Sequence, residues 1–431
     1  MPRPMPLLCA VLALTTACTV IYQRVDDTSD LTSARVWPGI SILLSDSMEL
    51  VRNKRVGLLT NQAAVDRSGK RDIDLLRTDR RAVQANVQLV ALFAPEHGLS
   101  AKEDRTNLLS TVDPQSNLPV YSLYANETMA PPDSAIEKLD VVMIDLPDVG
   151  VRTWTYEAAM VYTMRAAARL KKPVIVLDRP NPITGSVVEG PVLDSALANA
   201  DDPAPGHPGL AYAFVPIPLR HGMTMAELAR YYNVTLKIGA DLHIVPIVGW
   251  HREVWYDRTG LPFVPPSPNL PSFRSVQLYS ALVPFEATNL SVGRGTSLPF
   301  QFIGAPWLDT KQVLKLLKDA GVRGVQFTPM DVTPYQASDG KYNGTTIHGL
   351  RLTVTDRSAL QTPRVLANLL VAIHHVHPTQ LQMDTLRFDR LFGSTADRQA
   401  LFRGDDPDAV IDREYAPAYA FRERVHRYLL Y

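Results

Sequence analysis

The stretch Leu89-Val90-Ala91-Leu92-Phe93-Ala94-Pro95-Glu96-His97-Gly98 joins an apolar run to a short polar loop. The run is typical of a buried strand, and the loop supplies a carboxylate, an imidazole and a permissive glycine. Open α/β sheets present their chemistry in such loops, at the carboxyl ends of their strands. Glu96 is therefore our first candidate for a catalytic acid. The alternative is that Glu96 caps the next segment and His97 hydrogen-bonds a backbone carbonyl.

Strand-like and helix-like segments alternate on both sides of this stretch. This alternation predicts a mostly parallel sheet with helices on both faces, which is an α/β fold. The expected strands are 55–60, 89–93, 120–123, 141–145, 173–177 and 242–248, and the expected helices are 73–76, 132–139, 155–170 and 223–232. Thr224 and Glu227 have the spacing of a capping box at the start of the last helix.

We place the α/β domain at residues 37–258 and a smaller α+β domain at 259–431. In the second domain, strands are expected at 324–327 and 350–354, and helices at 311–319 and 363–375.

Composition excludes several classes of function. The 431 residues carry 44 basic and 44 acidic side chains, without a basic block interleaved with aromatics, so no nucleic-acid partner is expected. The dinucleotide and P-loop glycine motifs and the Gly-x-Ser-x-Gly elbow are absent. The two cysteines are Cys9 and Cys18, which leaves no thiol chemistry beyond Cys18. We expect neither a cofactor nor a metal.

The first 18 residues resemble an export signal. The apolar stretch 7–14 is too short to span a bilayer and precedes Thr15-Thr16-Ala17-Cys18, which resembles a lipobox. Residues 19–36 are then a tether. We expect an exported protein, periplasmic or in the cell envelope, whose contact with the membrane is a lipid anchor on Cys18.

Polar clusters follow three more strand-like segments. They are Asp145–Arg152, Asp178–Pro182 and Leu219–Gly222, and their candidate ligand-binding side chains are Asp148, Arg152, Arg179, Asn181, Arg220 and His221. Each cluster alone has a structural explanation, such as an ion pair or a turn. Together they favour a polar ligand site, because folding seldom requires so many groups that are costly to desolvate.

Carboxylates without a thiol or an activated serine are typical of general acid/base catalysis. Trp154 and Tyr156 could stack on a sugar ring, whereas Trp250 and Trp255 are expected in the core. Glycoside cleavage fits this set, since it needs one protonated carboxyl group and usually a second group at the anomeric carbon.

A colinear series of motifs between about residues 54 and 356 resembles a bacterial family, formerly a domain of unknown function, of exo-β-N-acetylmuramidases of the NamZ type. The matching blocks are 58–62, 95–98, 178–182, 188–191, 220–224, 266–269 and 288–296. The resemblance implies a Rossmann-like domain, a smaller C-terminal domain, and a cleft between them. It also implies removal of terminal N-acetylmuramic acid from peptidoglycan fragments, so that muramyl saccharides are the partners.

By this resemblance Glu96 is the catalytic acid. Our mechanistic hypothesis adds that His97 tunes it. The second catalytic group stays open among Glu189, Asp148 and Glu286, with Glu189 ranked first. Arg220, Arg294 and Arg179 are the candidates for the lactyl carboxylate of muramic acid. The matched blocks add Asn61 and Asn289 as substrate-binding residues. The rival hypotheses are a non-catalytic envelope protein that binds cell-wall saccharides, and a hydrolase for another sugar or an amide.

Overall fold

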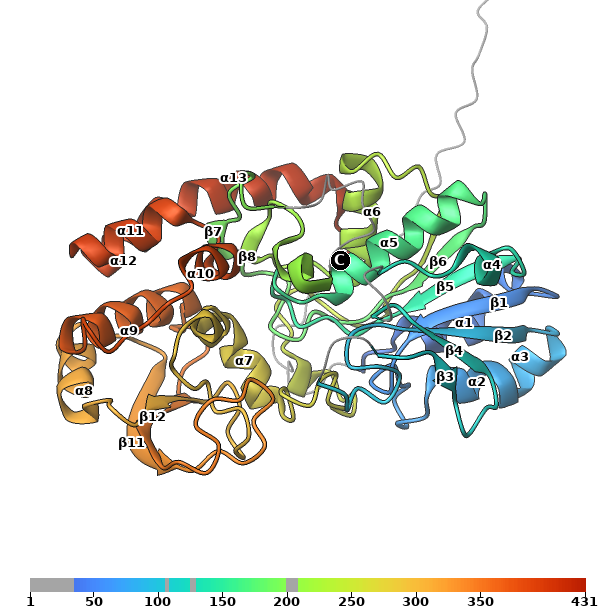
Figure 1. Cartoon of the computed structure of the whole chain (residues 1–431). Coiled ribbons are helices and arrows are strands. Elements are labelled where there is room, and N and C mark those ends of the chain that lie inside the picture. Colours follow the sequence, from blue (N-terminus) through green and yellow to red (C-terminus); the bar gives the residue numbers. More distant parts are fainter. Residues whose placement is uncertain (1–34, 105–107, 125–128, 199–207) are drawn as a thin grey trace, which may run out of the picture.

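The computed structural model describes residues 35–104, 108–124, 129–198 and 208–431. A seven-stranded sheet of order β3-β4-β2-β1-β5-β6-β9 lies at the centre of the first half of the molecule (Figure 1). Its strands are β1 (Arg55–Thr60), β2 (Gln88–Ala94), β3 (Thr111–Val112), β4 (Pro119–Ser122), β5 (Val141–Asp145), β6 (Val174–Leu177) and β9 (Leu242–Val245). All neighbours are parallel except β3 and β4. The predicted mostly parallel sheet is confirmed.

Helices cover both faces of this sheet because its central strands are apolar on both sides. In β5, Val142 and Ile144 belong to one apolar cluster, whereas Val141 and Met143 belong to the other. The first cluster includes residues of α4 (Asp133–Ile136), α5 (Tyr156–Arg169) and α6 (Met225–Thr235). The second includes residues of α1 (Gly39–Asp46), α2 (Asp72–Thr78) and α3 (Arg80–Gln84).

The register brings the ends of the central strands to one edge. Leu59 pairs with Phe93, and Thr60 pairs with Asp145. The loops that follow β1, β2 and β5 therefore leave the sheet side by side, as expected for parallel strands.

Helix α6 begins where the capping box predicts. The Thr224 side chain accepts the Glu227 N–H, and the Glu227 side chain accepts the Thr224 N–H. Asp178, just after β6, accepts hydrogen bonds from Thr224 Oγ1 (2.8 Å) and from the Ala226 N–H (3.0 Å). This strand-end carboxylate thus anchors a helix N-terminus.

The second half contains a three-stranded antiparallel sheet and a set of helices. The sheet has the order β10 (Phe302–Ala305), β12 (Ile347–Val354), β11 (Val325–Val332). The helices are α7 (Phe273–Leu282), α8 (Thr310–Asp319), α9 (Thr362–Val376), α10 (Thr385–Phe392), α11 (Thr395–Arg403), α12 (Pro407–Arg413) and α13 (Tyr415–Val425). The predicted α+β character is confirmed, although α7, β10 and α10 to α13 were not predicted.

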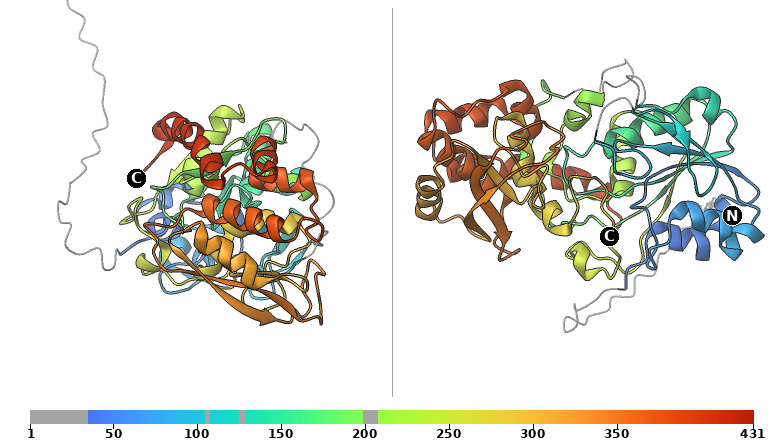
Figure 2. Two further views of the ribbon diagram at one scale, coloured as in Figure 1. Left: turned by 90° about the vertical axis from the view of Figure 1, so that its left-hand side faces the viewer. Right: turned by 60° about the horizontal axis from the view of Figure 1, so that its bottom comes forward.

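The end of the chain returns to the first half. The Tyr431 hydroxyl donates to Asp178 (2.7 Å), and Arg230 of α6 donates to the Tyr428 carbonyl (2.6 Å). Helix α13 also contacts β7 (Glu189–Val192), which pairs with β8 (Pro218–Arg220). In the right-hand view of Figure 2 the C-terminus, marked C, lies between the two halves.

Short 3₁₀ segments complete the described part of the fold: η1 (Met48–Leu50), η2 (Pro208–Ala213), η3 (Tyr256–Arg258), η4 (Val283–Ala287) and η5 (His426–Tyr428). Of the helices in the described ranges, none has the length and apolar character needed to cross a bilayer. The predicted signal, Cys18 and most of the tether lie outside the described residues.

Candidate active site

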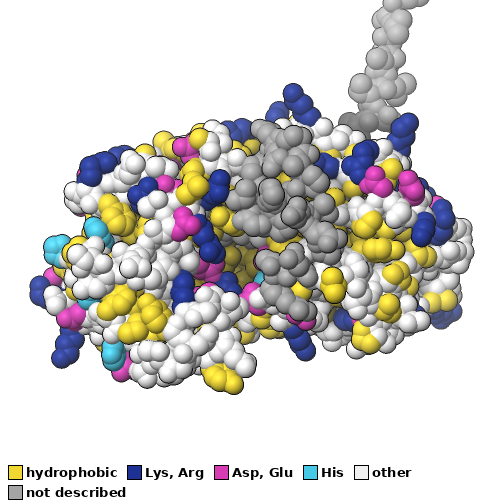
Figure 3. All heavy atoms as spheres, viewed as in Figure 1, with side chains coloured by type: hydrophobic (Ala, Val, Ile, Leu, Met, Phe, Trp, Pro, Cys, Tyr) yellow, Lys and Arg dark blue, Asp and Glu magenta, His cyan; other side chains and the backbone are white. Residues whose placement is uncertain are grey.

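A cavity of about 620 Å³ lies between the two halves of the molecule, beside the edge where β2 ends. From the first half it is lined by Glu96, His97, Asp104 and Thr155. From the second half it is lined by Glu286, Arg294, Lys341 and Arg387. Figure 3 shows a hollow between the halves, with acidic and basic side chains along it.

Glu96 lies two residues after the end of β2 and is half-buried in this cavity. Its Oε2 accepts a hydrogen bond from Thr155 Oγ1 (2.5 Å), and the Tyr124 hydroxyl lies 3.4 Å from the same oxygen. Burial and the nearby Glu96 charge raise the pKa of Tyr124 well above its ordinary value, so its hydroxyl keeps its proton. The carboxyl group is thus held by hydroxyl donors and faces the cavity.

His97 shapes the loop behind Glu96. Its φ of 68° lies in the left-handed region, and Gly98 follows with φ 70°, so the chain turns sharply after Glu96. His97 Nδ1 lies 2.7 Å from the Glu103 carbonyl, which can only accept, so Nδ1 carries a proton. His97 therefore holds the loop 97–103 together. No contact that would show it tuning Glu96 is found among the described residues, and that role stays a prediction.

Arg294 organises the carboxylates of the cavity. Its guanidinium lies 2.9 Å from Asp104 Oδ2 and 2.5 Å from Glu286 Oε1, and it donates to Ser338 Oγ (3.0 Å). Burial alone would raise the pKa of Asp104, but the Arg294 charge and hydrogen bonds from Ser338 and Asn269 outweigh it and lower that pKa. Asp104 is therefore an ionised carboxylate in the same cavity as Glu96.

Two further cations line the second half of the cavity. Lys341 Nζ donates to the carbonyls of Glu286 (3.1 Å) and Leu290 (3.0 Å). Arg387, in the first turn of α10, is exposed, and its guanidinium has no partner among the described residues.

Aromatic rings form part of the wall. Trp154 lines the cavity, and its indole N–H donates to the Pro147 carbonyl (3.1 Å). Tyr156, also considered for sugar stacking, does not line the cavity: it is fully buried and donates to the Pro266 carbonyl (2.7 Å). Trp250 is 2% exposed and packs against Tyr431, as expected for a core residue.

Other predicted site residues lie in buried pairs outside this cavity. Glu189 is paired with Arg220 (3.1 Å) and accepts from the Thr362 N–H (3.2 Å) and hydroxyl (2.9 Å). This contact ties β7 and β8 to the start of α9. Arg179 forms a two-pronged ion pair with Asp145. The geometry thus favours a structural role for Glu189, Arg220 and Arg179.

The predicted asparagines and Arg152 are likewise occupied by the protein. Arg152 donates to the carbonyls of Arg390 (3.0 Å) and Leu391 (2.9 Å), across the junction of the two halves. Asn181 donates to the Met223 carbonyl (2.8 Å), and Asn61 to the Tyr156 hydroxyl (2.8 Å). The Asn289 side chain donates to the Gln380 carbonyl (2.8 Å) and accepts from the Gln382 N–H (3.0 Å). These hydrogen bonds give each of the four side chains a structural role that requires no ligand.

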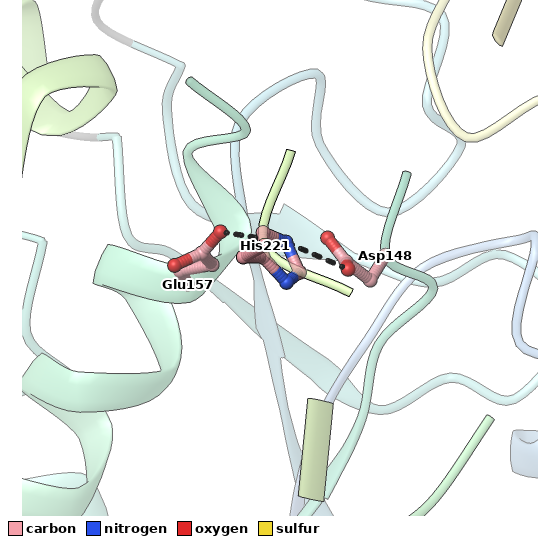
Figure 4. Close-up of side chains that lie close together, drawn as sticks. All are labelled: Asp148, Glu157 and His221. Carbon is pink, nitrogen blue, oxygen red and sulfur yellow. Dashed lines mark ion pairs between the residues drawn. The ribbon is translucent and has the colours of Figure 1, made fainter. Parts of the chain in front are cut away.

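Asp148, Glu157 and His221 form a buried cluster in the first half of the molecule, and none of them lines the cavity (Figure 4). His221 Nε2 lies 3.4 Å from Asp148 Oδ2 and 3.5 Å from Glu157 Oε1. This donor set is the one group among the described residues with the arrangement of a metal site. However, the Met223 N–H donates to His221 Nδ1 (3.1 Å), which places the ring proton on Nε2.

A metal-binding histidine normally does the opposite and donates through its second nitrogen. We therefore interpret His221 as an ionic partner of the two acids rather than as a metal ligand. Burial alone would lower the pKa of His221, but the nearby charge of Asp148 outweighs it and raises that pKa. Burial raises the pKa of Glu157 to about 8, so this group holds its proton at neutral pH.

A larger hollow of about 1010 Å³ lies elsewhere, between α7 and the end of β12. Its lining residues include Phe273, Arg351 and Arg357, and none of the predicted site residues. Size alone therefore does not identify the site.

Several cavity residues were not predicted from the sequence. Asp104, Thr155, Lys341 and Arg387 belong to no motif that marks them as functional. Asn269 did lie in a matched block, Pro266–Asn269, and its amide bonds Asp104. That matched block was the one feature of the sequence that pointed to this part of the cavity.

Comparison with known proteins agrees with this architecture. A model described as the N-terminal part of exo-β-N-acetylmuramidase NamZ matches residues 56–274, and one described as its C-terminal part matches 277–431. The peptidoglycan β-N-acetylmuramidase NamZ of Bacillus subtilis is 36% identical over 399 residues, 92% of this chain and 92% of that protein. Crystal structures of two DUF1343 family proteins of Bacteroides fragilis have TM-scores of 0.79 and 0.69, at 30% and 28% identity, and cover 92% of this chain and 99% of their own. The chain belongs to the NamZ family of exo-β-N-acetylmuramidases.

Proposed function

We infer that this protein is an exo-acting glycoside hydrolase that releases terminal N-acetylmuramic acid from peptidoglycan fragments during cell-wall turnover. The observation that carries this inference is the position of Glu96, half-buried in the cavity between the two halves and held by Thr155. Membership of the NamZ family supports the same reaction and substrate.

Glu96 is the proposed general acid. It donates a proton to the glycosidic oxygen as the bond from that oxygen to the anomeric carbon breaks. The resulting carboxylate then takes a proton from the water that attacks the anomeric carbon. Thr155 keeps the carboxyl group oriented through both steps.

The ionised carboxylate of Asp104 supports the second half of the mechanism. The transition state of glycoside cleavage resembles an oxocarbenium ion, and a fixed negative charge in the cavity stabilises it. Of the second groups predicted from the sequence, Glu286 lines the cavity, whereas Glu189 lies in a buried ion pair outside it and Asp148 beside His221. The proposal therefore places the second group among Asp104 and Glu286.

The test is Glu96→Gln assayed with a fluorogenic β-N-acetylmuramide. We expect kcat to fall by roughly 10²–10⁴ while the variant still binds N-acetylmuramic acid. Glu49→Gln, an exposed residue of η1, is the matched control and should keep full activity. If the wild type releases no sugar but binds it, the saccharide-binding hypothesis replaces the enzyme.

We also propose that the chain is exported and lipidated on Cys18. The support is the apolar stretch 7–14 followed by small residues and Cys18. Cells grown with labelled palmitate should label the wild type but not Cys18→Ala, and Cys9→Ala should be labelled like the wild type. Equal labelling of Cys18→Ala and the wild type would contradict the anchor.

A further inference from the structure

Most charged groups in the cavity already have an ionic partner within the protein. Arg294 pairs with both Asp104 (2.9 Å) and Glu286 (2.5 Å). Lys341 lies 3.8 Å from Asp339 and also donates to two carbonyls. Two ionisable groups of the cavity remain without an ion pair among the described residues. They are Glu96, held by hydroxyl groups, and Arg387.

We propose that Arg387 binds the carboxylate of the lactyl ether of the muramic acid residue and thereby selects muramyl over glucosaminyl substrates. The proposal rests on the function inferred above. N-acetylmuramic acid differs from N-acetylglucosamine by this ether at O3, so its carboxylate is the one anionic group that distinguishes the two sugars. A guanidinium can grip a carboxylate through two parallel hydrogen bonds.

The position of Arg387 is unfavourable for folding alone. It lies in the first turn of α10, where the helix dipole favours acidic rather than basic side chains. It also faces other cations, because its charge and that of Arg294 contribute to the lowered pKa of Lys341, in which burial is the largest cause. A bound anion would offset both the unfavourable interaction with the helix dipole and the repulsion from the neighbouring cations.

The backbone that carries Arg387 is well fixed. Asp384 caps α10 by accepting the Arg387 N–H (3.0 Å), and the Asp384 N–H donates to the Ala287 carbonyl (2.8 Å). The next residue, Phe388, is fully buried. Only the side chain of Arg387 has to order on binding, which limits the entropic cost.

The arginines predicted from the sequence for this carboxylate are occupied. Arg179 and Arg220 are buried in ion pairs with Asp145 and Glu189, and Arg294 bridges two carboxylates. Arg387 comes from the opposite half of the molecule to Glu96, so one sugar ring held between them would touch both halves.

The experiment compares Arg387→Ala, Arg387→Lys and the wild type on a fluorogenic β-N-acetylmuramide and on its methyl ester. For the acid, we expect KM of Arg387→Ala to rise roughly 10–100-fold, the range for hydrogen bonds to a charged group, with kcat nearly unchanged. The ester should show no such difference, and Arg387→Lys should recover part of the loss. Arg422→Ala, an exposed arginine of α13 outside the cavity, is the matched control. Equal effects on acid and ester, or no effect on either, would overturn the proposal.

Calorimetric titration with free N-acetylmuramic acid and N-acetylglucosamine separates this inference from the catalytic one. In one outcome, the wild type hydrolyses nothing but binds N-acetylmuramic acid more tightly than N-acetylglucosamine, and Arg387→Ala loses this preference. That outcome supports the role of Arg387 in binding and refutes the proposed catalytic activity. A wild type that hydrolyses the muramide, with the same sugar preference retained in Arg387→Ala, refutes Arg387 alone. Absence of binding to either sugar in the titration counts against Arg387.

Discussion

The cavity and the buried cluster of Asp148, Glu157 and His221 contain the same kinds of side chain but use them differently. The cluster of Asp148, Glu157 and His221 is buried, and its histidine lies within ion-pair distance of both carboxyl groups. In the cavity, Glu96 and Arg387 are half-buried or exposed and have no ionic partner within the described residues. The difference shows that the site is marked by ionisable groups without an ionic partner in the protein. The mere presence of acids and arginines does not mark it.

Glu189 and Arg220 make the same point. Both belong to strongly matched motifs, yet they neutralise each other under the junction of the two halves. A structural role can account for such a motif as well as a catalytic role can. Replacing one partner would leave the other as an uncompensated buried charge, which is costly.

The largest effect on stability is expected from Arg220→Ala. This change leaves Glu189 buried without its cation and removes the contact of the guanidinium with Trp255. We expect a loss of about 3–5 kcal/mol in the free energy of unfolding, measured by urea titration. The paired replacement Arg220→Met with Glu189→Leu should recover much of it. A Glu189→Gln variant of normal stability whose kcat falls a hundredfold would break the comparison, since Glu189 would then be catalytic.

A pH-dependent loss of stability is expected from Glu157. Its pKa is raised from 4.5 to about 8, mainly by burial, so the folded state holds a proton that the unfolded state releases above about pH 4.5. This contribution is complete below that pH and is lost as the pH rises to about 8, on the order of 2–4 kcal/mol. Urea unfolding between pH 5 and 8.5 should give a flatter profile for Glu157→Gln. Asp178, also raised, to about 7, remains in both proteins, so the difference between them isolates Glu157.

Asp104→Asn should affect catalysis more than stability. It removes a negative charge from the cavity and one partner of Arg294. We expect kcat/KM to fall roughly 10–100-fold, about 1.4–2.7 kcal/mol, with little change in the free energy of unfolding. The control is Asp257→Asn, which removes an ion pair with Arg357 outside the cavity. A loss of stability equal to the loss of activity would place Asp104 with the buried pairs instead.

The smallest effect is expected from Asp319→Asn. Its ion pair with Lys315 (3.2 Å) is exposed on α8, where the gain is screened by water. The free energy of unfolding should change by about 0.5 kcal/mol or less, with activity unchanged. This variant sets the scale on which the buried pairs and the cavity are compared.

The strands of the first half were predictable because their apolar runs are short and bounded by turn residues. Residues 89–93 and 141–145 match β2 and β5 to within one or two residues at each end. Helices α10 to α13 were not predicted. Helices α10 and α12 are short, and the segments of α11 and α13 carry many charges and little apolar periodicity. They are stabilised by packing against the rest of the chain, as when Phe388 and Phe421 are fully buried.

By itself, the sequence determined the parallel sheet, the edge at which Glu96 emerges and the family to which the chain is similar. Those features depend on local patterns, namely strand periodicity, capping and colinear motifs. Only the tertiary structure decided which charged residues form ion pairs with one another. Arg220 meets Glu189, and Arg294 meets Asp104, across 31 and 190 residues of chain. Whether a charge is left for a ligand depends on such distant partners, and no local pattern records them.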